Sequence, residues 1–126
     1  QLQFMVKKQN LIKVISKFYF FFKENNIFSN FVVIKKTNEK GHYLKFVGKG
    51  FTVSMDIKIN SKFKILKEFI NQIVFSENLK VNIAKDFITD KENMLKYNNF
   101  SKFKKDLSLF NGEKKLNSFL SKRINL

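Results

Sequence analysis

The fold is decided by one stretch, Phe51-Thr52-Val53-Ser54-Met55-Asp56-Ile57-Lys58-Ile59, in which apolar and polar side chains alternate. Successive side chains of a β-strand point to opposite faces, so this pattern predicts a strand with one buried face over 51–59. Thr52 and Ser54 then lie side by side on the other, more polar face. The chain is therefore expected to build a sheet with one apolar side and one polar side.

Helices and further strands are predicted on both sides of this stretch. Apolar residues recur at every second position in the predicted strands and at every third or fourth position in the predicted helices. Ser61 is suited to cap the helix that follows. The long connection between Thr37 and Gly50 holds three of the four glycines. The expected elements are a strand over 1–6, a helix over 10–25, a largely buried strand over 28–36, the strand over 51–59, a helix from 61 to about 77 and a strand over 79–84.

This order of elements is that of an α+β, ferredoxin-like β-α-β-β-α-β fold, an antiparallel sheet with helices on one face. Beyond it the sequence predicts a short helical C-terminal tail. Thr89 and Glu92 have the spacing of a capping box, which predicts a helix to about Tyr97. Shorter helical segments are expected around 100–107 and 116–120. We therefore divide the chain into an α+β domain over residues 1–84 and a helical segment over residues 85–126.

Composition limits the classes of protein to which the chain can belong. It has 126 residues, 44% of them hydrophobic, enough for one modest core. It contains no Cys, and His42 is the single histidine, which argues against a disulfide framework and a His- or Cys-based metal site. The apolar run 11–22 is interrupted by Lys13 and Lys17 and is too short to cross a bilayer.

The formal charge of +15 suggests an anionic partner such as nucleic acid or acidic lipid. However, Arg123 is the single arginine among 25 basic residues, whereas phosphate and base recognition depend heavily on the bidentate guanidinium group. The abundance of Lys, Asn, Ile and Phe is what an AT-rich coding sequence would give. The charge is therefore a weak indicator of function.

Motifs for nucleotide binding or hydrolysis are missing from the sequence. The glycines, Gly41, Gly48, Gly50 and Gly112, have neither GxGxxG nor Walker spacing. There is no GxSxG elbow and no His–Cys pair. Hydrolytic chemistry built wholly from this chain is not expected.

Two segments together carry a family resemblance. Gly50-Phe51-Thr52-Val53-Ser54-Met55-Asp56-Ile57, followed after a helix by Asn82-Ile83-Ala84-Lys85-Asp86, resembles the C-terminal region of FAD-linked oxidases of the vanillyl-alcohol-oxidase superfamily. The likeness is closest to the decaprenylphosphoryl-β-D-ribose 2'-oxidases and the aldonolactone oxidases, and it runs from Gln1 to Leu126. The resemblance implies an enzyme fragment that oxidises a sugar hydroxyl, of polyprenylphosphoryl-pentose or aldonolactone type, by hydride transfer to flavin.

The resemblance also implies roles for particular residues. Lys85 matches the family lysine that reaches the flavin ring, where a fixed cation stabilises the charge left by hydride transfer. Lys35 matches a lysine that points to the substrate sugar, with Lys36 as the competing match. Asn82 stands beside the cofactor position, where the family has an aromatic hydroxyl. The residues implied at the substrate are Gln1, Gln3, Val33, Lys35, Thr52 and Ser54.

FAD would be held mainly by an N-terminal FAD-binding domain that is missing from this chain, so residues 1–84 are expected to form part of a substrate-binding (cap) domain that is inactive alone. Residues 85–126 would return toward the FAD-binding domain. The chain begins at Gln1, and we expect it to be the C-terminal part of a longer polypeptide. The expected partners are this domain and a sugar or polyprenyl-phosphate-sugar substrate.

Two other functions stay open. A small basic RRM-like RNA-binding module has the same element order, and Lys49-Gly50-Phe51 matches the start of its RNP1 pattern. Thr52 and Val53 depart from that pattern, so a nucleic-acid partner is disfavoured. The other is a structural domain whose lysines contact acidic lipid. No signal sequence is visible, and a cytoplasmic or peripheral membrane location is expected.

Overall fold

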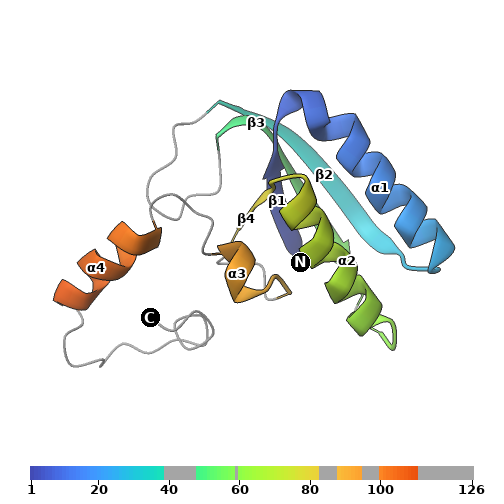
Figure 1. The fold of residues 1–126 in the computed structure, drawn as a ribbon. Coiled ribbons are helices and arrows are strands. Elements are labelled where there is room, and N and C mark those ends of the chain that lie inside the picture. Colours follow the sequence, from blue (N-terminus) through green and yellow to red (C-terminus); the bar gives the residue numbers. More distant parts are fainter. Residues whose placement is uncertain (39–47, 59, 83–87, 95–99, 111–126) are drawn as a thin grey trace.

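The computed structural model describes residues 1–126 except 39–47, 59, 83–87, 95–99 and 111–126. The sheet and the two long helices are built from the N-terminal part of the chain, and two shorter helices follow them in the sequence. Figure 1 shows this arrangement. The elements are β1 (Leu2–Val6), the 3-10 helix η1 (Lys8–Asn10), α1 (Leu11–Glu24), β2 (Ser29–Asn38), β3 (Lys49–Ile57), α2 (Phe63–Ser76), β4 (Lys80–Val81), α3 (Lys91–Met94) and α4 (Phe100–Phe110).

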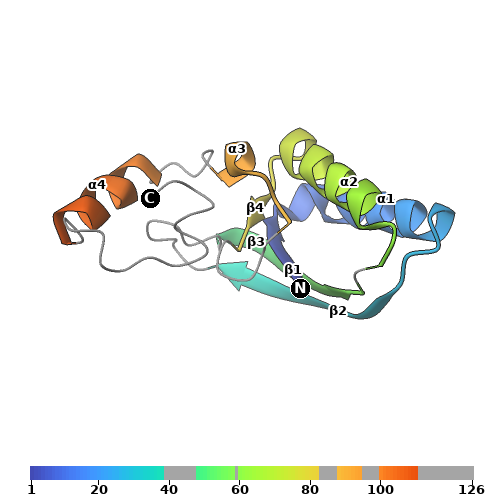
Figure 2. The ribbon, with the colours of Figure 1, turned by 90° about the horizontal axis from the view of Figure 1, so that it is seen from below.

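The strands form one antiparallel sheet in the order β2-β3-β1-β4. β1 and β2 both run antiparallel to β3, which lies between them, so they are parallel to each other and α1 makes the crossover connection. This is the split β-α-β arrangement of a ferredoxin-like fold, as the order of elements predicted. Helices α1 and α2 both cover the same face of the sheet (Figure 2).

The core lies between the helices and this face. Leu2, Phe4 and Val6 of β1 are at most 2% exposed and pack against the apolar stripes of α1 and α2. The Phe18 ring of α1 stacks on Phe4, with centroids 5.4 Å apart, and meets Phe69 of α2 edge to face at 5.2 Å. Large aromatic rings therefore hold both helices to the central strand.

Both long helices end in the same way. Asn26 and Asn78 have positive φ angles of 49° and 50°, and the residue after each, Ile27 or Leu79, is buried and donates its backbone N–H back to the last turn. These are Schellman motifs, in which asparagine replaces the usual glycine. Both helices thus end close to the predicted positions, residue 25 and about residue 77.

Glu77, at the end of α2, joins the two helices through its carboxylate. Its Oε1 lies 2.5 Å from Lys17 Nζ and 2.9 Å from Lys13 Nζ, both on α1, while its own side chain is 4% exposed. The hydrogen bonds from Lys17 and Lys13 lower the pKa of Glu77, against the opposing effect of burial. The ion pair fixes the last turn of α2 against α1.

Two details differ from the sequence prediction. β2 was expected to be largely buried, but Phe31, Val32 and Ile34 are 44–48% exposed because β2 lies at the edge of the described sheet. Ser61 was expected to cap α2. The helix instead begins at Phe63, and the backbone N–H of Lys62 donates to the Asn60 side chain at 2.9 Å.

A β-bulge interrupts β2 near its start. Ser29 pairs with Ile57 and Phe31 pairs with Asp56, so two steps along β2 match one step along β3. The Ser29 hydroxyl lies 2.9 Å from the Phe31 carbonyl and 3.0 Å from that of Asp56 and stabilises this irregularity. From Phe31 to Asn38 the two strands stay in regular register.

The C-terminal part is only partly described. β4 covers Lys80–Val81, shorter than the strand predicted over 79–84. α3 begins at Lys91, two residues after the predicted Thr89 cap, and α4 confirms the helix expected around 100–107. Asn71 of α2 ties α3 to α2, since its Oδ1 accepts from Asp90 N at 2.7 Å and from Asn93 Nδ2 at 3.0 Å. The helix predicted over 116–120 lies outside the described residues.

Candidate functional site

The strands divide their side chains between two sides of the sheet. We call the side opposite α1 and α2 the open face (Figure 2). Leu2, Phe4 and Val6 are buried beneath the helices, so these residues and their partners on the neighbouring strands lie on the helix side. The residues that alternate with them along each strand therefore belong to the open face. The strand residues of the open face are Gln3, Met5, Phe31, Val33, Lys35, Thr37, Gly50, Thr52, Ser54, Asp56 and Lys80.

Two rows across the open face contain the residues implied at the substrate. Gln3 pairs with Ser54, which pairs with Val33. Two residues along each strand, Met5 pairs with Thr52, which pairs with Lys35. Directly opposed residues of antiparallel strands have Cβ atoms about 4.5–5.5 Å apart, so each row is a line of neighbouring side chains. Strands far apart in the sequence thus bring these residues together.

Lys35 and Lys36 lie on opposite sides of the sheet. Lys35 pairs with Thr52 and belongs to the open face, whereas Lys36 pairs with Phe51, which packs against the core on the helix side. Of the two lysines matched to the substrate position in the sequence, Lys35 is the one that shares a face with Gln3 and Ser54.

Asn82, just past β4, extends the first row by a direct contact. Its Nδ2 donates to Gln3 Oε1 at 2.7 Å, and its backbone N–H donates to the Gln3 carbonyl at 2.8 Å. The carboxamide oxygen of Gln3 is therefore occupied, and the NH2 group on the same side chain is the part suited to meet an oxygen of a ligand. Asn82 therefore orients the Gln3 side chain on the open face.

The second row is less accessible than the first. Met5 and Thr52 are 8% and 9% exposed, and the Thr52 Oγ1 lies 3.5 Å from the Lys35 carbonyl. Ser54, Gln3 and Val33 are half-buried, and Lys35 is exposed. A ligand on the open face would therefore meet the Ser54 hydroxyl and the Lys35 ammonium group more readily than Thr52.

Gln1 and Lys85 complete the set of predicted site residues. Gln1 directly precedes β1 and is exposed, two residues before Gln3, so it continues the same alternation. Lys85, matched to the flavin position, lies outside the described residues. Met5, Asp56 and Phe31 also belong to the open face, although no sequence motif assigned them a role. Strand alternation alone could have indicated them.

The RNA-binding alternative requires aromatic side chains on the open face. The candidate aromatics, Phe4 and Phe51, both project to the helix side, and Phe4 is fully buried. The helices cover Phe4, and Phe51 lies on the helix side, so neither ring is available for stacking on the open face. Among the strand residues of the described open face, Phe31 of the edge strand β2 alone is aromatic, so the predicted pair of stacking rings is not formed there. This observation weighs against an RRM-like mode of RNA binding.

Metal-ligand groups and membrane-spanning helices can be assessed in the described part of the chain. Within it, no three His, Cys, Asp or Glu side chains come together in a group that could hold a metal ion. None of its helices combines the length and apolar character needed to cross a membrane.

No protein-family model matches the chain, and no curated protein matches it either. Function is therefore inferred from the arrangement of the open face and from the segments quoted above.

Proposed function

We propose that this chain is the substrate-binding part of an FAD-dependent oxidoreductase that oxidises a sugar hydroxyl, of polyprenylphosphoryl-pentose or aldonolactone type. The observation that carries the proposal is the shared face. Gln3, Val33, Lys35, Thr52 and Ser54 were matched to a substrate site one by one, and the register puts all five on the open face of three adjacent strands.

The chemistry of this face suits a sugar. Sugar hydroxyl groups need closely spaced donors and acceptors, and the first row offers the Gln3 carboxamide and the Ser54 hydroxyl beside the Val33 side chain. Lys35 adds a cation that can bind a hydroxyl or phosphate oxygen of the substrate. Asn82 holds the Gln3 side chain in the orientation that donates to the ligand.

The residues present also fit a flavin supplied by another domain. The open face has no covering from α1 or α2, and Asn82 places a polar side chain at its β4 edge. Bound there, FAD would supply the hydride acceptor. The tasks of this chain are to bind the sugar through Gln3, Ser54 and Lys35 and to bring Lys85, by its family resemblance, to the flavin ring.

Anaerobic flavin reduction in the intact flavoprotein that carries this chain tests the proposal. With an aldono-1,4-lactone or a polyprenylphosphoryl-pentose as substrate, bleaching near 450 nm reports hydride transfer. Lys35→Met should raise the half-saturating substrate concentration by about ten-fold, as expected for one lost charge-assisted hydrogen bond. Lys64→Met, an exposed lysine on α2, is the matched control and should leave reduction unchanged.

The outcome is decisive in both directions. Equal effects of the two substitutions, or no effect of Lys35→Met, would remove the open face from substrate binding. A polypeptide that binds no flavin at all would remove the proposed class of enzyme.

A further inference from the structure

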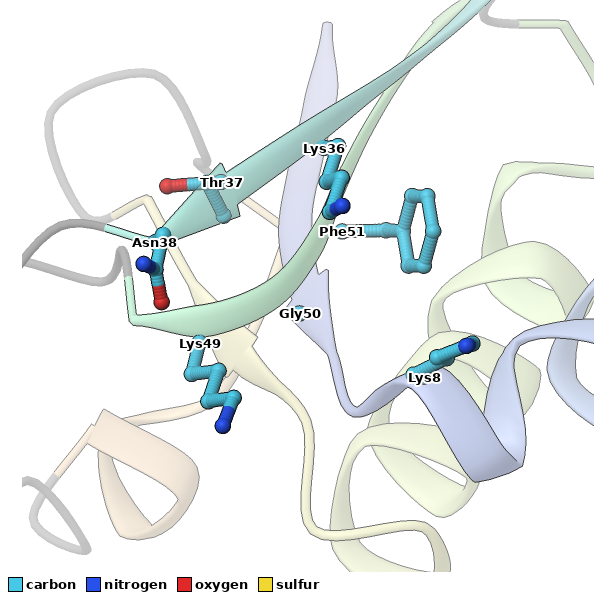
Figure 3. Close-up of a pocket in the computed structure, with 7 residues that line it drawn as sticks. All are labelled: Lys8, Lys36, Thr37, Asn38, Lys49, Gly50 and Phe51. Carbon is cyan, nitrogen blue, oxygen red and sulfur yellow. The ribbon is translucent and has the colours of Figure 1, made fainter.

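A cavity of about 450 Å³ lies on the other side of the sheet, between η1 and the paired ends of β2 and β3 (Figure 3). Ligand pockets typically have volumes of about 300–1,000 Å³, so this one could hold a small molecule. Its lining residues are Lys8, Lys36, Thr37, Asn38, Lys49, Gly50 and Phe51.

Strand register places most of this lining on the helix side. Lys36 pairs with Phe51, and Asn38 pairs with Lys49, each on the side of the sheet that carries the core. Lys8 joins them from η1, the short helix that follows β1. The cavity therefore begins where α1 no longer covers the sheet, and it is separated from the open face by the strands themselves.

The charge of the cavity is one-sided. Three of its seven lining residues are lysines, and no carboxylate is among those seven. Figure 3 shows the Phe51 ring between the side chains of Lys36 and Lys8, with Asn38 and Lys49 at the strand ends. All three lysines are exposed, so they give the cavity a positive charge that water and salt partly screen.

We infer that this cavity binds the phosphate group of a small ligand. A phosphate monoester carries a charge near −2 at neutral pH and has three acceptor oxygens, which can pair with several ammonium groups at once. The Asn38 amide is a further donor, and the Phe51 ring offers an apolar wall for the part of the ligand that bears the phosphate. A singly charged carboxylate would neutralise less of the positive charge of the cavity.

Gly50 permits the close packing of β3 against the end of β1 that forms the floor of the cavity. A Cβ atom at this position would lie 2.3 Å from the Val6 carbonyl oxygen, much closer than van der Waals contact. Glycine therefore lets β3 approach the end of β1, and this approach brings Lys8 of η1 near Phe51 and Lys36. The site is a product of the backbone path as well as of the lysine side chains.

Titration of the 126-residue chain with inorganic pyrophosphate, followed by amide NMR at fixed ionic strength, tests the inference. The expected result is saturable binding, with shifts confined to Lys8, 36–38 and 49–51 and none at Gln3 or Ser54. The double substitution Lys8→Ser with Lys36→Ser should weaken binding by at least about ten-fold, the order expected for loss of charge-assisted hydrogen bonds.

A charge-matched control separates a site from general attraction. Lys23→Ser with Lys64→Ser removes the same two charges from exposed helix positions and should change binding by less than about two-fold, because exposed charges at a distance are screened by salt. Equal weakening by both pairs, or shifts that do not saturate, overturns the inference. Unchanged chemical-shift dispersion in both double variants shows that the fold is intact.

The source of the phosphate is distinguished by a second arm with vesicles of phosphatidic acid, whose headgroup is a phosphate monoester, in phosphatidylcholine. Binding of pyrophosphate without binding of vesicles supports a free phosphorylated ligand. Vesicle binding that is lost in the Lys8/Lys36 pair and kept in the Lys23/Lys64 pair supports a lipid headgroup in the same cavity. The amides expected to shift line the cavity and do not include Gln3 or Ser54, so absence of pyrophosphate binding would leave the open-face proposal unaffected. Failure of the open-face proposal would likewise leave the cavity proposal unaffected.

Discussion

Replacing Gly50 with alanine should destabilise the sheet far more than the same replacement at Gly48. The new Cβ would meet the Val6 carbonyl oxygen at 2.3 Å, the Val6 carbonyl carbon at 3.2 Å and Lys7 Cα at 3.3 Å. Carbon and oxygen atoms that are not bonded normally stay at least about 3.3 Å apart, so β1 and β3 must separate by roughly 1 Å or tilt. All three contacted atoms belong to the backbone, which cannot rotate away.

The cost follows from two contributions. Overpacking a fixed site typically costs about 1–3 kcal/mol, and an unfavourable backbone conformation, here φ of 159°, costs about 1–3 kcal/mol more. We expect Gly50→Ala to lower the free energy of unfolding by about 2–6 kcal/mol. A domain of this size has about 5–15 kcal/mol in total, so the loss should be large enough to measure by urea denaturation monitored by circular dichroism.

Gly48→Ala is the matched control. Its Cβ would lie 3.2 Å from Met5 Cε, the mobile end of a flexible side chain, which can give way. We expect a change of less than about 1 kcal/mol. If Gly50→Ala shifted the urea midpoint no more than Gly48→Ala does, the close approach of β3 to β1 would be refuted, and with it the described floor of the cavity.

Two further predictions concern the helix layer. Glu77→Gln should destabilise the protein at neutral pH, because it removes the carboxylate that pairs with Lys17 and Lys13. The pKa of Glu77 in the folded protein lies below its ordinary 4.5, so the loss of stability should persist above about pH 4.5 and shrink as the pH falls through the folded pKa. Acid titration of both proteins would reveal this difference. Phe18→Ala should cost about 3–5 kcal/mol in urea unfolding, since the ring is 2% exposed, whereas Phe20→Ala, at 57% exposure, should cost under about 1 kcal/mol; similar losses would contradict the described core.

Alternation and helical periodicity predicted the fold well because they report burial directly. Phe51 to Ile57 do form a strand, and the stripes around Phe18 and Ile70 do face the sheet. The same signals failed for β2, since a run such as Phe31 to Ile34 is equally apolar in a central strand and at an edge. The position of a strand in a sheet depends on pairing, which local sequence does not contain.

The candidate site illustrates the same limit. Sequence spacing left Lys35 and Lys36 as competing matches, and only the pairing with Thr52 and Phe51 assigns them to different faces. The hydrogen bond from Asn82 to Gln3 joins residues 79 positions apart, so no local pattern could indicate it. The basic cavity was missed for the same reason, because Lys8 comes near Lys36 only after β1 and β3 have paired.

The bulge at Ser29 has a consequence for how this protein can tolerate insertions and deletions. Adding or removing one residue between Phe31 and Lys35 would exchange Lys35 and Lys36 between the two faces and so disturb both proposed ligand sites together. A length change at the bulge itself can be taken up where the pairing is already irregular, and every residue downstream would keep its side. Homologous chains that differ in length along this strand should therefore differ at its first two or three residues.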